Sequence, residues 1–572
     1  MKLPLLARVL ALIAVITHVE ARILGSKKTA SNKSALKQSK KSKKSLPNKP
    51  LSCDPGYYRS KITEQCVKAC DASNNVMLFG ETVSCSITYF APNIIGGHTI
   101  PQSIVGLGQL TYLDLNSGGI MRKLPSELGT LTDLVHLSLS YNEITGTIPT
   151  ELGKLTRLTN LDFGGNKLTG TIPNEFRELQ NLVSVALYDN SLRGSIPTIW
   201  SKVLTSLDFE LNHLSGAIPS QLGLLSRLNS LGLEGNQLSG SIPSELGLLT
   251  NLTFIDLSNN LDISGEIPSE LGLITLLETL DVSSNTLNGA IPSELGELRR
   301  LFYLDLRFNQ LNGEIPSSFG GLAFLQIMLL SDNQFSGPIS DALGQLSSLL
   351  TLDLSSNEII GAIPSALGQL TELSYLDLSF NKFNGPIPQA LGKLSKVYDL
   401  DLSFNMLDGE IPESLGLLSS MATLDLHSNK ISGTIPSSFG ELSSLGELYL
   451  SYNKFTGPIP SGLANLSFLS KLDLSSNELT GIIPDELSEL SSLSTLDLRS
   501  NRFTGTIPTT LGKLTALESI FLDSNNLTGT MPSGICLLRD PISFHLTVLT
   551  ADCGGTHSPV KCDSPTCCTK CF

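Results

Sequence analysis

A column of regularly spaced carboxylates is the first candidate for chemistry in this chain. Asp353 stands between two leucines in Leu352-Asp353-Leu354, and the same pattern returns about every 24 residues. An aspartate fills this place in twelve of eighteen units: Asp114, Asp162, Asp208, Asp256, Asp281, Asp305, Asp353, Asp377, Asp401, Asp425, Asp473 and Asp497. If the leucines lie on one face of a strand, each aspartate points out of the other face, and neighbouring parallel strands lie about 4.8 Å apart. Carboxylates at that spacing raise one another's pKa.

We interpret this column as solvated scaffold, with serines two residues further on, such as Ser355, Ser379 and Ser403, donating hydrogen bonds to it. A calcium-binding strip is the alternative, but calcium takes about six to eight oxygen ligands and no loop supplies them. We therefore expect no metal site and no cofactor. Glycoside hydrolysis needs two carboxylates in different environments, which a uniform row does not provide.

Other catalytic signatures are missing from the sequence. The seven histidines share no metal-ligand spacing, and there is no H-E-x-x-H, G-x-S-x-G, Walker or protein-kinase motif. The chain reaches Phe572 soon after its last unit, so we expect no kinase domain. The sequence predicts a protein that is not an enzyme.

The elements that position the aspartates are repeats, seen clearly in residues 345–368, QLSSLLTLDLSSNEIIGAIPSALG. The repeat asparagine recurs as Asn142, Asn166, Asn190, Asn212, Asn236, Asn260, Asn285, Asn309, Asn333, Asn357, Asn381, Asn405, Asn429, Asn453, Asn477, Asn501 and Asn525, and Gly118 takes its place in a leading unit. Nearly all spacings are 24; Asn190 to Asn212 is 22 and Asn260 to Asn285 is 25. Self-similarity at this period predicts a solenoid.

Each residue type in the unit has a structural reason. Alternating leucines predict a short strand with one buried face, which stacked units join into a parallel sheet and a continuous core. The asparagine is expected to be buried and bonded to backbone groups that the turn leaves unpaired. Gly361 permits a tight bend and Pro364 fixes φ without a donor. The predicted fold is an α/β solenoid of about 18 repeats with a parallel, concave sheet.

The unit resembles the plant-type leucine-rich repeat, whose mark is a G-x-I-P sequence after the asparagine. It appears as Gly146-Thr147-Ile148-Pro149, Gly265-Glu266-Ile267-Pro268 and Gly505-Thr506-Ile507-Pro508, within about residues 110–535. Gly337-Pro338-Ile339-Ser340 lacks the proline, and the leading unit has only Leu124-Pro125. The resemblance implies an extracellular recognition surface, as in receptor ectodomains and secreted inhibitor proteins.

The segments outside the repeats indicate export. Residues 1–21 are typical of a cleaved signal peptide, with an uncleaved anchor as the alternative, and residues 22–52 are rich in Lys and Ser. Residues 1–50 carry 12 Lys and Arg against one acid, which leaves 27 against 52 for the rest. This basic segment is interpreted as a disordered linker or removed pro-segment; the alternative is a tether to a polyanionic surface. Nucleic acid is not expected, because the folded body is acidic.

The ten cysteines are confined to two expected caps, residues 53–109 and 536–572. They are Cys53, Cys66, Cys70 and Cys85, then Cys536, Cys553, Cys562, Cys567, Cys568 and Cys571. An exported chain favours disulfides, whose pairing the spacing leaves open; a metal site among the last four is the alternative. Glycosylation sequons stand at Asn32, Asn251, Asn465 and Asn526.

We place the ligand surface on the concave face between Tyr303 and Phe404. Its candidate residues are Tyr303, Asp305, Arg307, Ile327, Leu329, Tyr375, Phe380 and Phe404, with Phe308 nearby. Alternation points Ile327 and Leu329 outward while Met328 and Leu330 fill the core, and exposed apolar residues mark interaction sites. The alternative is that the phenylalanines pack against the next turn.

The expected function is secreted recognition of a protein, peptide or glycan, with a membrane co-receptor as a further candidate partner. The alternative is a structural or adhesive protein of the cell wall or cell surface that binds wall polymer, mineral or another polyanion.

Overall fold

The computed structural model describes residues 57–59, 66–68, 75–78, 81–84, 87–90, 97–538, 546–552, 560–561 and 570–571. The chain divides into two compact units, Met1–Tyr58 and Arg59–Phe572, and the second unit contains all of the repeats. The expected signal peptide and basic segment lie outside the described residues.

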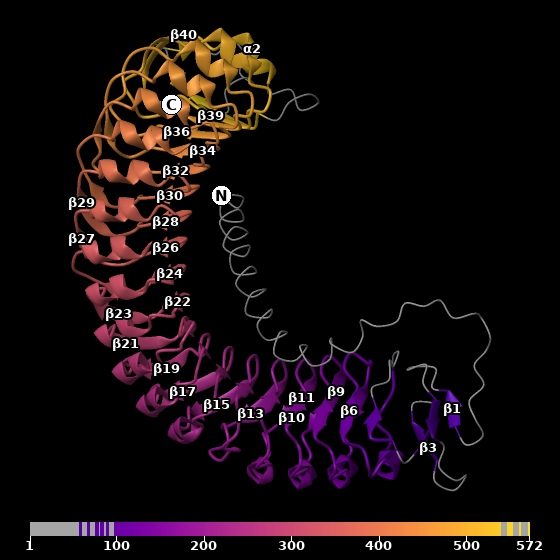
Figure 1. The fold of residues 1–572 in the computed structure, drawn as a ribbon. Coiled ribbons are helices and arrows are strands. Elements are labelled where there is room, and N and C mark those ends of the chain that lie inside the picture. The colour runs from indigo at the N-terminus through magenta and orange to yellow at the C-terminus, as the bar shows by residue number, and fades with distance from the viewer. Residues whose placement is uncertain are drawn as a thin grey trace, which may run out of the picture. The chain divides into compact units, whose positions relative to one another are not determined.

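A long parallel sheet runs through the repeats and lines the inner side of their curved stack (Figure 1). Register is kept from unit to unit: Leu352 pairs with Leu376 and Asp353 with Asp377. In order, its strands are β5 (Tyr89–Phe90), β6 (Tyr112–Asp114), β8 (His136–Ser138), β10 (Asn160–Asp162), β12 (Ser184–Ala186), β14 (Ser206–Asp208), β16 (Ser230–Gly232), β18 (Phe254–Asp256), β20 (Thr279–Asp281), β22 (Tyr303–Asp305), β24 (Ile327–Leu329), β26 (Thr351–Asp353), β28 (Tyr375–Asp377), β30 (Asp399–Asp401), β32 (Thr423–Asp425), β34 (Glu447–Tyr449), β36 (Lys471–Asp473), β37 (Thr495–Asp497), β39 (Ser519–Phe521), β41 (Val548–Ala551) and β43 (Lys570–Cys571).

The outer side of the stack carries 3₁₀ helices (Figure 1). They are η1 (Gln102–Gly106), η2 (Ser126–Thr130), η3 (Thr150–Lys154), η4 (Asn174–Glu178), η5 (Ser220–Leu224), η6 (Ser244–Leu248), η7 (Ser269–Leu273), η8 (Ser293–Glu297), η9 (Ser317–Gly321), η10 (Asp341–Gln345), η11 (Ser365–Gln369), η12 (Gln389–Lys393), η13 (Glu413–Leu417), η14 (Ser437–Glu441), η15 (Ser461–Asn465), η16 (Asp485–Glu489) and η17 (Thr509–Lys513), followed by α2 (Ser533–Leu537). A Cβ on Gly368 would lie 2.3 Å from the Ala390 carbonyl oxygen, so the close approach of η11 to η12 requires glycine there.

The residues that lead into the G-x-I-P sequences form short strands, which pair into flanking parallel sheets. Gly361, with φ +85°, makes the expected bend. The flanking strands are β7 (Met121–Lys123), β9 (Glu143–Thr147), β11 (Lys167–Gly170), β13 (Ser191–Gly194), β15 (His213–Ala217), β17 (Gln237–Gly240), β19 (Asp262–Gly265), β21 (Thr286–Ala290), β23 (Gln310–Gly313), β25 (Gln334–Phe335), β27 (Ile360–Gly361), β29 (Lys382–Gly385), β31 (Met406–Leu407), β33 (Ser432–Gly433), β35 (Lys454–Phe455), β38 (Thr504–Thr506), β40 (Asn526–Thr530) and β42 (Val560–Lys561). Before the repeats lie β1 (Tyr57–Arg59), β2 (Cys66–Lys68) and the antiparallel pair β3 (Asn75–Leu78) and β4 (Glu81–Ser84).

The repeat asparagines form a buried hydrogen-bond ladder, as expected from the sequence. Asn381 Nδ2 donates to the carbonyl oxygens of Leu354 (2.8 Å), Ser379 (3.1 Å) and Leu378 (3.3 Å). Its Oδ1 accepts from the Ile359 backbone N–H at 3.0 Å. Each amide thus satisfies groups in its own unit and in the one before, which ties the units together.

Three irregular units have local explanations. In the 22-residue unit no helix forms between residues 195 and 205, and buried Trp200 fills the space, with its Nε1 donating to the Pro197 carbonyl oxygen at 2.7 Å. In the 25-residue unit Leu261 takes φ +39° and is exposed. Ser340, in place of proline, accepts a hydrogen bond from the Ala342 N–H and caps η10.

Candidate ligand-binding surface

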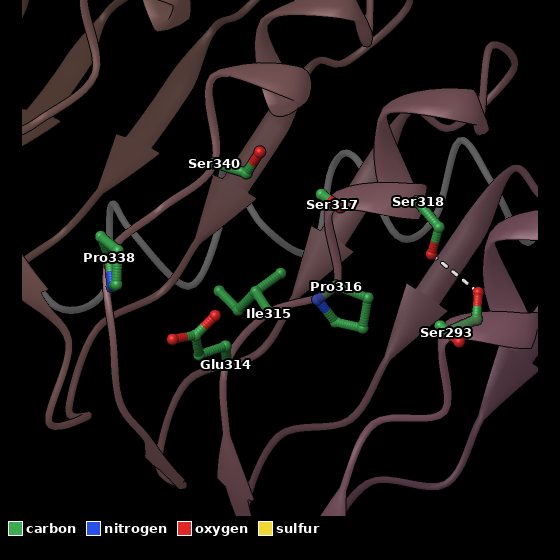
Figure 2. Close-up of a pocket in the computed structure, with 8 residues that line it drawn as sticks. All are labelled: Ser293, Glu314, Ile315, Pro316, Ser317, Ser318, Pro338 and Ser340. Carbon is green, nitrogen blue, oxygen red and sulfur yellow. Dashed lines mark hydrogen bonds between the residues drawn. The ribbon is translucent and has the colours of Figure 1, made fainter.

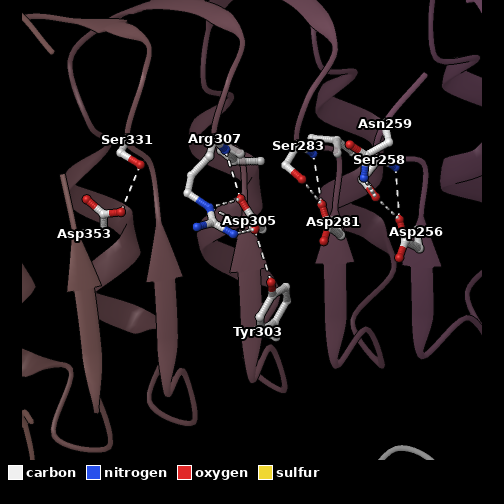
Figure 3. Close-up of polar contacts among 12 residues, drawn as sticks. Asp256, Ser258, Asn259, Asp281, Ser283, Tyr303, Asp305, Arg307, Ser331 and Asp353 are labelled. Carbon is white, nitrogen blue, oxygen red and sulfur yellow. Dashed lines mark hydrogen bonds and ion pairs between the residues drawn. The ribbon is translucent and has the colours of Figure 1, made fainter. Parts of the chain in front are cut away.

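The aspartate column runs in register along the sheet, and its main role is to end the strands (Figure 3). Asp353 Oδ1 accepts from the Ser355 backbone N–H at 3.0 Å and from Ser355 Oγ at 2.7 Å. Asp256 and Asp281 accept in the same way from the second residue that follows each of them (Figure 3). This turn bonds the N–H of the second residue after the strand through a side chain.

The expectation that this column is solvated is wrong for part of it. Asp305, Asp377, Asp401, Asp425 and Asp497 are buried. The turn bonds draw each carboxylate back onto the backbone, and the adjacent strands place side chains on both sides. The serines predicted to donate to the column do so, as the Asp401–Ser403 bond of 2.6 Å illustrates.

Burial and proximity raise several carboxyl pKa values. Burial first, and then the charge of Glu234, raise the pKa of Asp256 to about 7. Burial and the neighbouring charges of Asp305 and Asp256 hold the pKa of Asp281 well above its usual range. Burial and the charge of Asp473 raise the pKa of Asp497 to about 7. Among the described residues no group of three His, Cys, Asp or Glu is arranged to hold a metal ion.

Three of the predicted ligand residues are bonded to one another. Arg307 makes a bidentate ion pair with Asp305, with Nη2 2.6 Å and Nε 3.0 Å from its carboxylate (Figure 3). The Tyr303 hydroxyl donates to the same carboxylate at 3.1 Å. Tyr375 repeats this bond to Asp377 at 3.1 Å. These side chains are held in place before any ligand arrives.

Ile327 and Leu329 are not the exposed apolar pair that alternation predicts. They lie on the outward side of β24, but only 1% and 0% of their surface is exposed. Ile327 is flanked in register by Tyr303 and Thr351, and Leu329 by Asp305 and Asp353. Strand alternation predicted the direction of these side chains correctly. It did not predict that side chains of the neighbouring strands bury them.

Five exposed aromatic residues lie instead on one edge of the sheet. The residue just before each repeat asparagine, or before Gly118, has φ between +49° and +64° in all eighteen units. We call these residues the left-handed edge. Twelve are Ser, Gly, Asp or Asn; the bulky ones are Tyr141, Leu211, Phe308, Phe380, Phe404 and Tyr452. All six bulky residues are exposed.

Phe380 and Phe404 form an open aromatic pair on this edge. Their rings stack with centroids 4.1 Å apart, and their side chains are 52% and 41% exposed. The His427 ring meets Phe404 edge-on at 4.5 Å, and its Nδ1 lies 2.5 Å from Asp425 Oδ1. Burial lowers the pKa of His427, but the hydrogen bond and charge of Asp425 outweigh it and leave this pKa raised.

The sequence also matches known families. One leucine rich repeat model matches residues 324–383, 395–455, 419–479 and 459–503. A second leucine rich repeat model matches residues 133–155, 157–179, 227–249, 276–298 and 300–322. Of the solved structures, the plant peptide hormone receptor RGFR1 in complex with RGF2 is 31% identical. That match covers 83% of this chain and 84% of the receptor, with a TM-score of 0.69. The chain belongs to the leucine-rich repeat family.

Two further solved structures of receptors are similar to the chain. A TDR receptor is 32% identical, over 82% of this chain and 84% of that one, with a TM-score of 0.73. The Arabidopsis receptor kinase HAESA, in complex with the peptide hormone IDA and the co-receptor SERK1, is 32% identical over 85% and 88%, with a TM-score of 0.64. No curated protein matches the chain by sequence.

Hollows on the flank of the leucine-rich repeats belong to the scaffold. One of about 510 Å³ is lined by Ser293, Glu314, Ile315, Pro316, Ser317, Ser318, Pro338 and Ser340 (Figure 2). Ser318 Oγ donates across units to the Ser293 carbonyl oxygen at 2.7 Å (Figure 2). A hollow of about 580 Å³ occupies the same part of the repeat near Pro219 and Pro243. A shape that recurs with the repeat is a consequence of stacking.

The remaining predicted sites are only partly described. Cys536 on α2 is disulfide-bonded; the side chains of the other nine cysteines lie outside the described residues. The sequon asparagines Asn251, Asn465 and Asn526 are exposed, and Asn32 lies outside the described part. In the described residues no helix is both long enough and apolar enough to cross a bilayer.

Two aromatic groups near the start of the repeats were missed by sequence reasoning. Tyr89, Tyr112 and His136 stack across β5, β6 and β8 with centroids 4.4 and 4.2 Å apart. Tyr141 and Tyr188 meet edge-on at 5.9 Å. The signal for the second group was the Gly164-Gly165 pair between them, which leaves room for both rings.

Proposed function

We propose that this leucine-rich repeat protein is an extracellular, non-enzymatic recognition protein that binds a peptide or protein segment. The binding surface runs along the sheet and its left-handed edge between Tyr303 and Phe404. The observation that carries the proposal is the open Phe380–Phe404 pair, and the peptide-hormone complexes of similar ectodomains support it.

Backbone strain at Phe380 and Phe404 supports a role for this aromatic pair in binding. A left-handed conformation costs an L-residue with a bulky side chain roughly 1–2 kcal/mol, while Gly, Asn and Asp adopt it more readily. Ser428, in the next unit, meets the same backbone requirement with a small side chain. Folding therefore does not require phenylalanine at 380 or 404, whereas binding of an apolar partner would.

Charge indicates the kind of partner. The outward positions lie six, four, two and one residues before each repeat asparagine, or before Gly118. They hold 19 Asp or Glu side chains and three Lys or Arg. All three bases are paired, Arg307 with Asp305, Lys471 with Glu447 and Arg499 with Asp497. Since opposite charges favour association, a segment with Lys or Arg beside an apolar residue fits this surface best.

The test is a panel of synthetic peptides, basic and acidic, with and without an apolar anchor, titrated against the full chain. The informative variant is Phe380→Ser with Phe404→Ser. The matched control is Phe324→Ser with Phe468→Ser, two phenylalanines in the turns after η9 and η15 that are 65% and 67% exposed. Loss of at least about tenfold in affinity in the first pair alone supports the proposal. Equal affinity in both pairs, or binding restricted to acidic peptides, contradicts it.

A further inference from the structure

A second aromatic structure stands on the first half of the sheet, away from the surface between Tyr303 and Phe404. Tyr141 and Tyr188 come from units on either side of the Asn166 unit. Their rings meet above that unit, with centroids 5.9 Å apart and an interplanar angle of 61°. The two rings form an open corner with Tyr141 as its floor and Tyr188 as its wall.

Glycines make this corner. A Cβ on Gly164 would lie 2.2 Å from Tyr188 Cε1, and one on Gly165 would lie 2.9 Å from Tyr141 Cδ1. The Asn166 unit is the one unit of eighteen with glycine at both positions before the repeat asparagine. Each ring therefore rests directly on backbone, which fixes its orientation without a side chain beneath it.

The floor of the corner is open, and carboxylates lie beside it. Tyr141 is 62% exposed, so the ring face turned away from Gly165 is free to be covered. Asp189, in the neighbouring unit, is exposed. Its backbone carbonyl oxygen accepts a hydrogen bond from the Asn166 N–H at 3.0 Å. Asp162, under the corner, accepts from the Gly164 N–H at 3.0 Å.

These features match the two sides of a pyranose ring. Its axial C–H bonds make an apolar face that packs on an aromatic ring, and its hydroxyl groups donate to carboxylates and exchange hydrogen bonds with phenols. The outward positions of the units from Gly118 to Asn212 hold no Lys or Arg. A uronic acid or a phosphate would find no counter-charge and would meet like charges instead.

We propose that the corner of Tyr141 and Tyr188 is a binding site for a neutral saccharide. One pyranose ring stacks on Tyr141, and its hydroxyl groups bond to Asp189 and to the two phenols. The site is independent of the proposed peptide surface, and either can fail alone.

The experiment titrates the full chain with three hexasaccharides, a β-1,4-glucan, a chitin oligomer and an oligogalacturonide, using calorimetry and saturation-transfer NMR. The variant is Tyr141→Ser, because serine occupies the left-handed edge in seven other units and keeps the fold. The matched control is Tyr452→Ser, a left-handed edge tyrosine that is 63% exposed. The next unit has Ser475 and Ser476 at the positions that correspond to Gly164 and Gly165.

The expected result is saturable binding of a neutral oligomer that falls about tenfold or more in Tyr141→Ser and is unchanged in Tyr452→Ser. NMR should show the strongest transfer to the C–H protons of one ring face. The proposal is overturned if neither neutral oligomer binds, if the galacturonide binds more tightly, or if both variants lose binding equally. Saturable binding of a basic peptide at this corner without saccharide binding would also overturn it.

Discussion

Removing one asparagine of the ladder should cost different amounts at two positions that look alike in the sequence. In a regular unit, Asn381→Ala removes three bonds to carbonyl oxygens and leaves the buried Ile359 N–H without its acceptor. At Asn285 the three donor bonds are all 3.0 Å, but among the described residues its buried Oδ1 accepts none. The 25-residue spacing places Leu261 in the preceding turn and interrupts the ladder.

The difference between the two variants isolates a single buried amide. An unsatisfied buried donor costs about 1–3 kcal/mol, so Asn381→Ala should be more destabilising than Asn285→Ala by that amount. Stability in a repeat protein is distributed over neighbouring units, so the assay is amide hydrogen exchange resolved at Ile359 together with denaturant unfolding. The Ile359 amide should lose about 5- to 150-fold in protection in Asn381→Ala. Equal loss of stability in the two variants would refute this account of the ladder.

Other predictions concern pH, packing and the caps. Burial raises the folded-state pKa of Asp497 to about 7 from 3.8, so the folded chain holds an extra proton between these values. Raising the pH through that window should lower stability by at most about 1.4 kcal/mol per pH unit from this group, and Asp497→Asn should flatten the melting profile. Gly368→Ala, whose Cβ would meet the carbonyl of Ala390, should lower stability by about 1–3 kcal/mol, while Gly108→Ala, with nothing within 4 Å, should change it little. All ten cysteines should resist a thiol reagent in the denatured, unreduced chain, and several reactive thiols would contradict the disulfide prediction. No stoichiometric calcium binding is expected along the aspartate column; several tight sites in a calorimetric titration would contradict this.

The repeated part of the fold was readable because its signals are local and recur. The leucine alternation, the buried asparagine and the bend at Gly361 each follow from the properties of one residue type in one place. The two units of abnormal length were visible in the sequence as irregular spacings, but the way each unit packs was not. Trp200 fills the space left by the missing helix, and Leu261 is exposed, because of packing between units.

The candidate site was harder to read because it depends on lateral neighbours and on backbone conformation. Alternation predicted the direction of Ile327 and Leu329, yet their cover comes from residues 24 positions away on each side. The left-handed backbone at Phe380 could not be inferred, since phenylalanine rarely adopts it. The sequence named Phe380 and Phe404 as candidates, while their exposure and stacking required the structure.

The most direct test of the central claim locates the bound peptide itself. A photoreactive benzophenone side chain would replace Ser356, which lies on the left-handed edge two units before Phe404. In a second protein it would replace Ser348, in the turn between η10 and β26. Each protein would be irradiated with the tightest-binding basic peptide from the panel, and the cross-linked residues identified by mass spectrometry. The account predicts cross-links from position 356 that excess unlabelled peptide abolishes, and none from position 348. Specific cross-links from position 348, with position 356 unreactive under saturating peptide, would contradict the claim.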